Sequence, residues 1–485
     1  MALAASALLL CLSGCRVGPD YQRPVVAVPA EWRWKSVERT EQAAATHSGG
    51  IWSVFNDPKL DELEALALDA NQEIRLALAR VDETRALARV GKADFFPQVS
   101  IQPTFRRQEQ SGGTFIPGIS SFAGPGGAGS IPGFRKPFND FLLPLNVAYE
   151  ADVWGRVRRS VEAGLDRAEA SVADYDAVRL TAAGDVAANY FLLRALDTQI
   201  DVLQQSLKLR KESQDLVDKR VKSGVADDLD LNRAKTEMAT SAASLADVKR
   251  QREQVANILA ILCGKTASNF TLEPKTLVGE PPVIPIGLPS ALLERRPDVI
   301  RAERLLAASS EEIGVAKAAY FPRLALTASG GFESADLTQL FRGSSTAWNV
   351  VANVVQPVFT GGKNKAQLDA AKARFEEACA QYNQQALVAF KDVEDALVDL
   401  RYLAEQGKAL SDAVESTRKV TQLATARYDA GRISYLEVVD AQRQQLAVEQ
   451  QAAQILGQRL VATARLIKAL GGGWTSGTEF VGAQK

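Results

Sequence analysis

The sequence predicts a mixed fold that combines very long α-helices with transmembrane β-strands. Two observations carry this prediction: the helix-forming residues Ala, Gln, Leu, Glu, Lys and Arg fill stretches of about 65 residues without proline, and shorter stretches alternate apolar and polar residues with period two. A third observation is that the motifs occur twice in the same order.

The duplicated motifs indicate an internal tandem repeat. "FFPQVSI" at Phe95 returns as "YFPRLAL" at Tyr320, and "RVKSGVADDLDLNRAK" at Arg220 returns as "RYDAGRISYLEVVDAQR" at Arg427. The repeats are expected to cover 57–270 and 297–473, with a linker at 271–296 and a C-terminal tail at 474–485.

Each repeat is predicted to contain a helix, a strand, a loop, a second strand and a helical hairpin. In the first repeat these are a helix from Asp57 to Ala93, a strand at 95–107, a loop at 108–141, a strand at 142–154 and a hairpin at 156–263. In the second they are a helix from Pro297 to Ala319, a strand at 321–333, a loop at 334–346, a strand at 347–359 and a hairpin at 364–470. The long helix of the first hairpin also carries coiled-coil spacing, at Leu193, Leu196, Ile200, Leu203 and Leu207.

Four strands cannot close a barrel, and an open sheet edge is not tolerated in lipid. The chain must therefore oligomerise or bury these strands elsewhere. Two copies give eight strands with a filled interior, whereas three copies give twelve and leave room for water. A wet inner wall would explain the polar set Asn146, Glu150, Asp152, Asn349 and Asn353. The alternative is a small soluble sandwich that carries two helical hairpins.

The N-terminal region predicts export and lipid attachment. Residues 1–14 resemble a signal peptide, and Leu12-Ser13-Gly14-Cys15 matches a lipobox, which predicts that Cys15 becomes an acylated N-terminus followed by an extended segment at 15–56. The alternative is a plain signal peptide with an incidental cysteine. For Cys263 and Cys379 we expect free thiols, although a bond between them is the alternative.

No catalytic or metal site is predicted, and no cofactor other than the lipid on Cys15. The glycines at 124–129 match a dinucleotide fingerprint, but they lie in a Gly/Pro-rich loop instead of between a strand and a helix. His47 is the one histidine, so no histidine triad or zinc cluster can form. A net charge of −1 gives no basic field for nucleic acid.

Several motifs together resemble the outer-membrane channel lipoproteins of RND-type tripartite efflux systems. These are "GCRVGPDYQRP" at Gly14, "WSVFNDPKLDELEALALDANQEIRLALARV" at Trp52, "FFPQVS" at Phe95 and "GLPSALLERRPDVIRAE" at Gly287. The family is the TolC/OprM-like outer membrane factor family, NodT-type subgroup, and the resemblance covers essentially the whole chain.

The resemblance implies a homotrimer with a twelve-stranded barrel in the outer membrane of a Gram-negative bacterium, continued by a periplasmic α-helical barrel. It implies a passive exit duct without enzymatic activity, which exports drugs, toxic small molecules or metal ions. The implied partners are a periplasmic adaptor protein, an inner-membrane RND pump and outer-membrane lipid. The alternatives are a duct for ABC-driven protein secretion and a structural periplasmic coiled-coil lipoprotein.

The resemblance also assigns roles to the hairpin ends. It implies that the glycine turns contact the adaptor through Ser223, Gly224, Val225, Ala226, Asp227, Gly431, Arg432, Ile433 and Ser434. The acids that follow each turn, Asp230 and Glu437, are candidates for a gate that closes the periplasmic mouth. Asp412, Glu415 and Arg418 are weaker candidates, because the gate motif of better-known members is displaced there.

Overall fold

A computed structural model describes residues 16–34, 51–109, 137–284 and 289–472. The chain divides into two compact units. The strand unit contains Met1–Gln22, Thr84–Ala168 and Leu306–Ala378, and the hairpin unit contains Arg23–Glu83, Glu169–Leu305 and Cys379–Lys485. The predicted loop at 108–141, Cys15, the signal peptide and the tail at 474–485 lie wholly or mostly outside the described residues.

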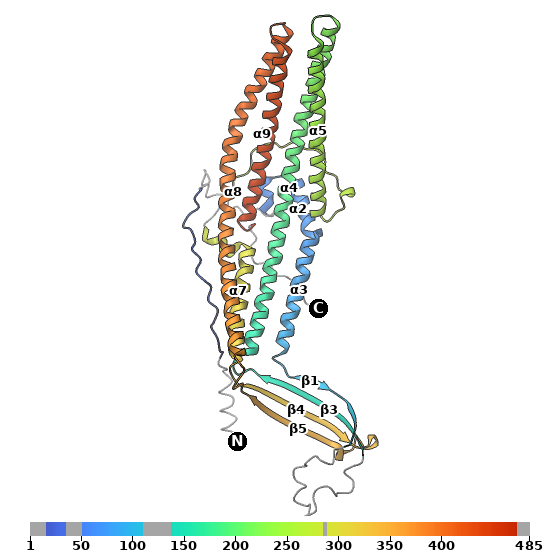
Figure 1. Cartoon of the computed structure of the whole chain (residues 1–485), viewed down its shortest axis with the longest axis vertical. Coiled ribbons are helices and arrows are strands. Elements are labelled where there is room, and N and C mark those ends of the chain that lie inside the picture. Colours follow the sequence, from blue (N-terminus) through green and yellow to red (C-terminus); the bar gives the residue numbers. More distant parts are fainter. Residues whose placement is uncertain (1–15, 35–50, 110–136, 285–288, 473–485) are drawn as a thin grey trace, which may run out of the picture. The chain divides into compact units, whose positions relative to one another are not determined.

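The strand unit is built on one antiparallel sheet with the order β1-β3-β4-β5, in which β2 also pairs with β3 (Figure 1). The strands are β1 Gln98–Ile101, β2 Thr104–Gln108, β3 Phe138–Ala151, β4 Arg323–Ser334 and β5 Thr346–Val355. Short 3-10 turns, Leu337–Gln339 and Gly343–Ser345, connect β4 to β5. Within the described residues, β1 and β2 pair only with β3, and β5 pairs only with β4.

The predicted strands require three corrections. The strand expected at 95–107 is interrupted between Ile101 and Thr104, where Pro103 has no N–H to donate to a ladder. The strand expected at 142–154 begins earlier, at Phe138, and ends at Ala151. The strand expected at 347–359 ends at Val355, before Pro357.

The hairpin unit holds two helical hairpins (Figure 1). Helices α4 Arg156–Lys222 and α5 Asp228–Leu262 form the first, and α8 Lys363–Asp429 and α9 Tyr435–Ala469 form the second. Helices α4 and α8 each contribute their first turns to the strand unit. The remaining helical elements are η1 Ile51–Phe55, α2 Pro58–Ala70, α3 Gln72–Ala93, η2 Ala267–Asn269, η3 Pro289–Ala291, α6 Leu292–Arg295 and α7 Pro297–Ala318.

The helix expected from Asp57 to Ala93 is two helices, because Asn71 adopts an extended backbone between α2 and α3. Its side-chain oxygen accepts from the N–H of Glu73, at 2.8 Å, and its side-chain amide donates to the carbonyl of Leu262, at 2.9 Å. The residue therefore caps α3 and ties it to the end of α5. The linker expected at 271–296 also contains the short turns η3 and α6.

The core of the hairpin unit lies along α4. The coiled-coil positions Leu193, Leu196 and Leu203 are buried, and Ile200 and Leu207 pack against the same cluster. Full burial of such a side chain contributes about 1.5–3 kcal/mol. Cys263 lies buried in this cluster and Cys379 is half-buried, and both thiols are free, as expected.

Across the part of the chain that the structure describes, no helix combines the length and the apolar character that a membrane crossing needs.

Candidate functional site

The sheet has one polar and one apolar face. Directly paired residues of an antiparallel sheet project from the same face, and the register places Asn146 opposite Ser100 and Ser329, with Asn349 next to Ser329. The predicted polar residues Asn146 and Asn349 therefore lie in one row across the sheet. Glu150 and Asn353 lie in a second row on the same face, with Ala325 between them.

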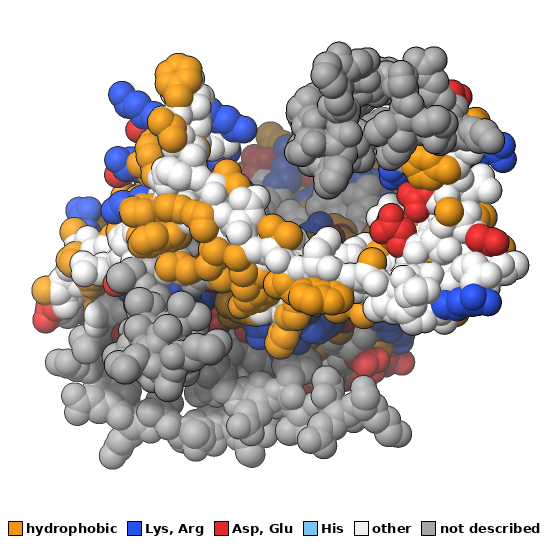
Figure 2. All heavy atoms as spheres, turned by 90° about the horizontal axis from the view of Figure 1, so that it is seen from below, with side chains coloured by type: hydrophobic (Ala, Val, Ile, Leu, Met, Phe, Trp, Pro, Cys, Tyr) orange, Lys and Arg blue, Asp and Glu red, His pale blue; other side chains and the backbone are white. Residues whose placement is uncertain are grey.

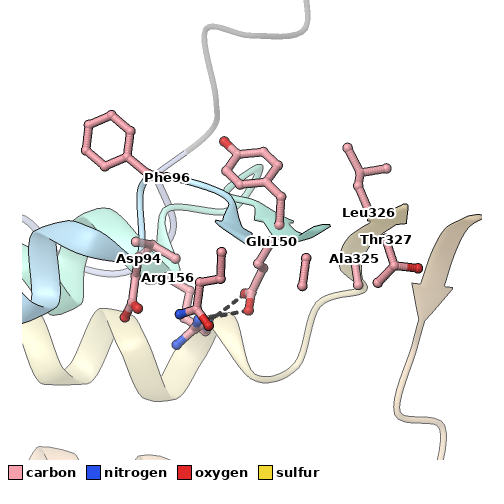
Figure 3. A pocket seen from close by; sticks show the side chains of 11 residues that line it. Asp94, Phe96, Glu150, Arg156, Ala325, Leu326 and Thr327 are labelled. Carbon is pink, nitrogen blue, oxygen red and sulfur yellow. Dashed lines mark hydrogen bonds and ion pairs between the residues drawn. The ribbon is translucent and has the colours of Figure 1, made fainter. Parts of the chain in front are cut away.

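Two acids at the end of β3 are paired with arginines of α4. Glu150 accepts two hydrogen bonds from Arg156, at 2.8 and 2.9 Å (Figure 3). Figure 3 shows this pair in a hollow that Asp94 and Phe96 border on one side, with Ala325 and Thr327 of β4 on the other. The charge of Glu150 is thus compensated within the chain.

Asp152 lies beyond the end of β3 and has a different place from the one predicted. Its carboxylate accepts from the N–H groups of Val157, at 3.0 Å, and Arg158, at 2.9 Å. These N–H groups belong to the first turn of α4, which has no partner for them within the helix. Asp152 therefore caps α4 and is not a residue of the polar rows.

The opposite face of the sheet is apolar and largely exposed. Figure 2 shows hydrophobic side chains gathered on the viewed face with few charged ones among them. The exposed apolar residues on this face of the sheet are Val99, Ile101, Phe105, Leu145, Leu326, Trp348, Val350 and Val354. A contiguous apolar patch of this kind marks a membrane or protein contact surface.

The hairpins turn at glycines with left-handed backbone. Gly224 has φ 70° and Gly431 has φ 68°, a conformation that only glycine adopts without cost. In each turn, the N–H that follows the glycine donates back to an arginine carbonyl: Val225 to Arg220 and Arg432 to Arg427, both at 2.9 Å. The predicted turn residues are mostly exposed, with 78% of Val225 accessible.

An arginine and an aromatic side chain join the two hairpins near their ends. The Arg220 guanidinium of α4 lies 4.4 Å from the centre of the Tyr428 ring of α8. It also donates to the carbonyls of Tyr428, at 3.3 Å, and Asp429, at 3.4 Å. Below this contact, a small cluster buries Val217, Ala234, Tyr428, Tyr435, Val438 and Val439.

A buried carboxylate joins the hairpins a second time. Glu237 of α5 accepts from Arg210 of α4, and its other oxygen accepts from the Nε of Arg443 of α9 at 2.9 Å. Burial alone would raise the pKa of Glu237, but the hydrogen bonds and charges of Arg443 and Arg210 outweigh it and hold the pKa below its usual range. Glu237 is therefore ionised at neutral pH and bridges both hairpins.

The predicted gate acids do not meet across the hairpins. Asp230 is half-buried and pairs with Arg233 of its own helix, at 3.3 Å, while Glu437 is exposed in the first turn of α9. Asp412 and Glu415 are exposed on α8. Arg418 pairs with Glu449, at 2.6 Å, which joins α8 to α9 within the second hairpin.

Comparison with known proteins decides the family. A family model described as "Outer membrane efflux protein" matches residues 63–265 and 288–472. This chain belongs to the outer membrane efflux protein family.

Individual members of the family match nearly the whole chain. The solvent efflux pump outer membrane protein SrpC of Pseudomonas putida is 32% identical over 96% of this chain and 97% of its own length. The cation efflux system protein CusC of Escherichia coli O157:H7 is 31% identical over the same shares of both chains. The solved structure of the outer-membrane channel OprN has a TM-score of 0.84 with 30% identity and covers 95% of this chain and 100% of its own.

The predicted family, function and location are confirmed. The chain is an outer-membrane efflux channel protein of a Gram-negative bacterium, extending into the periplasm. The family is one of transport proteins instead of enzymes. The described residues contain no group of three or more His, Cys, Asp or Glu side chains arranged to hold a metal ion.

In this efflux protein, sequence reasoning missed the residues that join the hairpins. Arg220 and Tyr428 lie in the two duplicated motifs around the glycine turns. Each motif has an arginine four residues before its glycine, and this shared arginine could have indicated a role near the turn. Glu237 and Arg443 had no such signal, since each lies on a helix that carries many other charged residues.

Proposed function

We propose that this efflux protein is a homotrimeric exit duct, in which three chains form a twelve-stranded barrel followed by an α-helical barrel. It would passively pass drugs, toxic small molecules or metal ions that an inner-membrane RND pump delivers through a periplasmic adaptor. Lipid on Cys15 would anchor each chain, and the two halves of the chain would be tandem repeats.

One observation carries the proposal: the sheet has a polar face, an exposed apolar face and two edges that find no partner among the described residues. Unpaired edges in lipid are costly unless another chain pairs with them. Pairing β5 of one chain with β1 and β2 of the next satisfies both edges. It also turns the rows of Asn146 and Asn349 toward a common interior while the apolar face meets lipid.

The exposed hairpin ends support contact with an adaptor. Val225 and Leu229 are accessible over 78% and 54% of their surface in and after the first turn. Burial of these two apolar side chains against a partner protein would be favourable. The full set proposed for this contact remains Ser223 to Asp227 and Gly431 to Ser434.

The contacts between hairpins support a gate at the same end. Arg220 with Tyr428, and Glu237 with Arg443, connect the first hairpin to the second within one chain. Opening by movement of one hairpin against the other would have to break them. Asp230, Glu437, Asp412, Glu415 and Arg418 remain gate candidates through contacts with neighbouring chains.

The substrate is proposed only as a broad class. SrpC is named for solvent efflux and CusC for cation efflux, yet both are almost equally similar to this chain. The polar rows carry neutral amide and hydroxyl groups, and Glu150 is compensated by Arg156. These features favour a permissive duct in which the pump selects.

The proposal is tested by the mass and conductance of the purified protein. Native mass spectrometry after mild detergent extraction is expected to show three chains, and planar bilayers are expected to show a low conductance that rises in Asp230→Ala or Glu237→Gln. A monomer or dimer without conductance would contradict the duct. Unchanged conductance in Asp230→Ala would remove that residue from the gate and leave the duct standing.

The partners are tested by cross-linking in the native host followed by mass spectrometry. An RND pump and an adaptor are expected to be recovered with the tagged chain, and their recovery is expected to fall in Val225→Asp. Recovery of an ABC exporter instead would move the proposal to protein secretion.

A further inference from the structure

The segment that directly follows Cys15 lies in a built site of the strand unit. The N–H of Val17 donates to the carbonyl of Trp154, at 3.2 Å. The Arg16 guanidinium pairs with Glu162 of α4 and with Glu311 of α7, the latter at 2.7 Å. Two helices and the turn before α4 therefore hold this segment.

The centre of the site is Arg159 of α4, whose side chain is completely buried. Its guanidinium donates to the carbonyls of Val17, at 3.1 Å, and Pro19, at 2.8 Å. It also pairs with buried Glu311, at 2.9 Å, and with Asp20, at 3.2 Å. A fully buried charge is costly unless it is paired and hydrogen-bonded, and here the backbone of the N-terminal segment supplies part of that compensation.

Two glycines let the segment come this close. Gly18 has φ 107°, and a Cβ atom there would lie 2.6 Å from the Cα of Gly314 in α7. A Cβ atom on Gly314 would lie 2.5 Å from the Cδ of Arg159. The site thus fits the backbone of residues 17–19 and leaves no room for a side chain at position 18.

We propose that α4, α7 and the Trp154–Gly155 turn form a docking site for residues 16–20. The acyl chains on Cys15 would then be attached to a rigid point of the strand unit instead of to a free tether. This inference rests on the proposed lipidation for its role, but the docking itself does not need the lipid. Arg159 acts as a positioning residue, because its guanidinium binds the backbone carbonyls of the segment.

The test measures how fast trypsin cuts the Arg16–Val17 bond in the folded full-length protein. Mass spectrometry detects the cleavage as the appearance of a new N-terminus at Val17. Cleavage of a docked segment needs local opening. We therefore expect the bond to be cut at least about tenfold faster in Arg159→Met and in Gly18→Ala than in the wild type. Cys15→Ala, secreted with a cleavable signal peptide, is expected to keep the slow rate.

The matched control is Arg167→Met, because Arg167 also joins α4 to α7, through Glu312, but does not contact the segment. Its cleavage rate at Arg16 is expected to stay at the wild-type value. Equal rates in wild type and Gly18→Ala would overturn the proposal, even if Arg159→Met fails to fold, since Gly18 lies on the segment itself. Fast cleavage in Cys15→Ala would also overturn it, because docking would then depend on the lipid.

Bilayer conductance of the same preparations tests the proposed duct independently of the docking of residues 16–20. Gly18→Ala is expected to conduct like the wild type while its N-terminal bond is cut faster. If the wild type shows no conductance, the proposed duct is contradicted, but the cleavage rates still report on the docking of residues 16–20.

Discussion

The two hairpin ends share a turn but differ in the side chains around it. Both turns place a glycine at nearly the same φ, 70° at Gly224 and 68° at Gly431, and both close with the same backbone hydrogen bond of 2.9 Å. The first end, however, contributes Arg220 and Glu237 to the contacts between hairpins. The second contributes the Tyr428 ring and Arg443.

This difference shows that one group of residues forms the turn and a separate group forms the contact between the hairpins. Counting from the glycine, Glu237 corresponds to Gln444 and Arg443 corresponds to Thr236. Complementary charges at non-equivalent positions fix which hairpin faces which, whereas like residues at equivalent positions would repel or leave a charge unpaired.

The largest effect is expected from Glu237→Gln. This change leaves the buried Arg210 without its carboxylate, and breaking a buried ion pair costs about 3 kcal/mol. Both hairpins should lose stability together, seen as a lower thermal midpoint and faster hydrogen exchange in the last turns of α4 and the first turns of α9. Asp247→Asn is the control on the same helix, because the pair of Asp247 with Arg250 is exposed, and it should change little.

The same contact should weaken in acid. The folded pKa of Glu237 lies below its ordinary value, so its contribution is fully present above about pH 4.5 and is lost as the pH falls through the folded pKa. The difference in thermal midpoint between wild type and Glu237→Gln is therefore expected to shrink from pH 7 to pH 3. A difference that stays constant would mean that the Glu237 charge does not join the hairpins.

The shared turns should respond alike to Gly224→Val and Gly431→Val. Left-handed backbone costs a side chain about 1–2 kcal/mol, and neither glycine has other atoms close to its Cβ position. Hydrogen exchange at each end should therefore show a similar local loss. A loss at one end only would show that the two turns are not equivalent.

The smallest effect separates the two helix starts. The Asp227 side chain accepts from the N–H of Leu229, whereas the Ser434 side chain makes no capping hydrogen bond. Asp227→Ala is expected to cost about 1 kcal/mol at the start of α5, and Ser434→Ala almost nothing at the start of α9. Equal losses in local hydrogen exchange would contradict this assignment.

Much of the local structure could be read from the sequence, because it depends on neighbours. Helix-forming composition and the glycine turns predicted a helical hairpin at 156–263, and its two helices run from Arg156 to Lys222 and from Asp228 to Leu262. Alternation predicted the two faces of the sheet, including the row of Asn146 and Asn349. The interruption between β1 and β2 was not predicted, although the missing N–H of Pro103 is a local property that could have indicated it.

The remaining features were decided by residues far apart in the chain. Arg220 reaches the carbonyl of Tyr428 across 208 positions, and Asn71 reaches that of Leu262 across 191. No local pattern encodes such a meeting, because many arginines and asparagines occupy similar helical positions. By itself the sequence determined which segments form helices, strands and turns, through propensity and period, but not the break at Asn71 or the strand ends. Only the tertiary structure decided which charges are buried together, because that depends on how the helices pack.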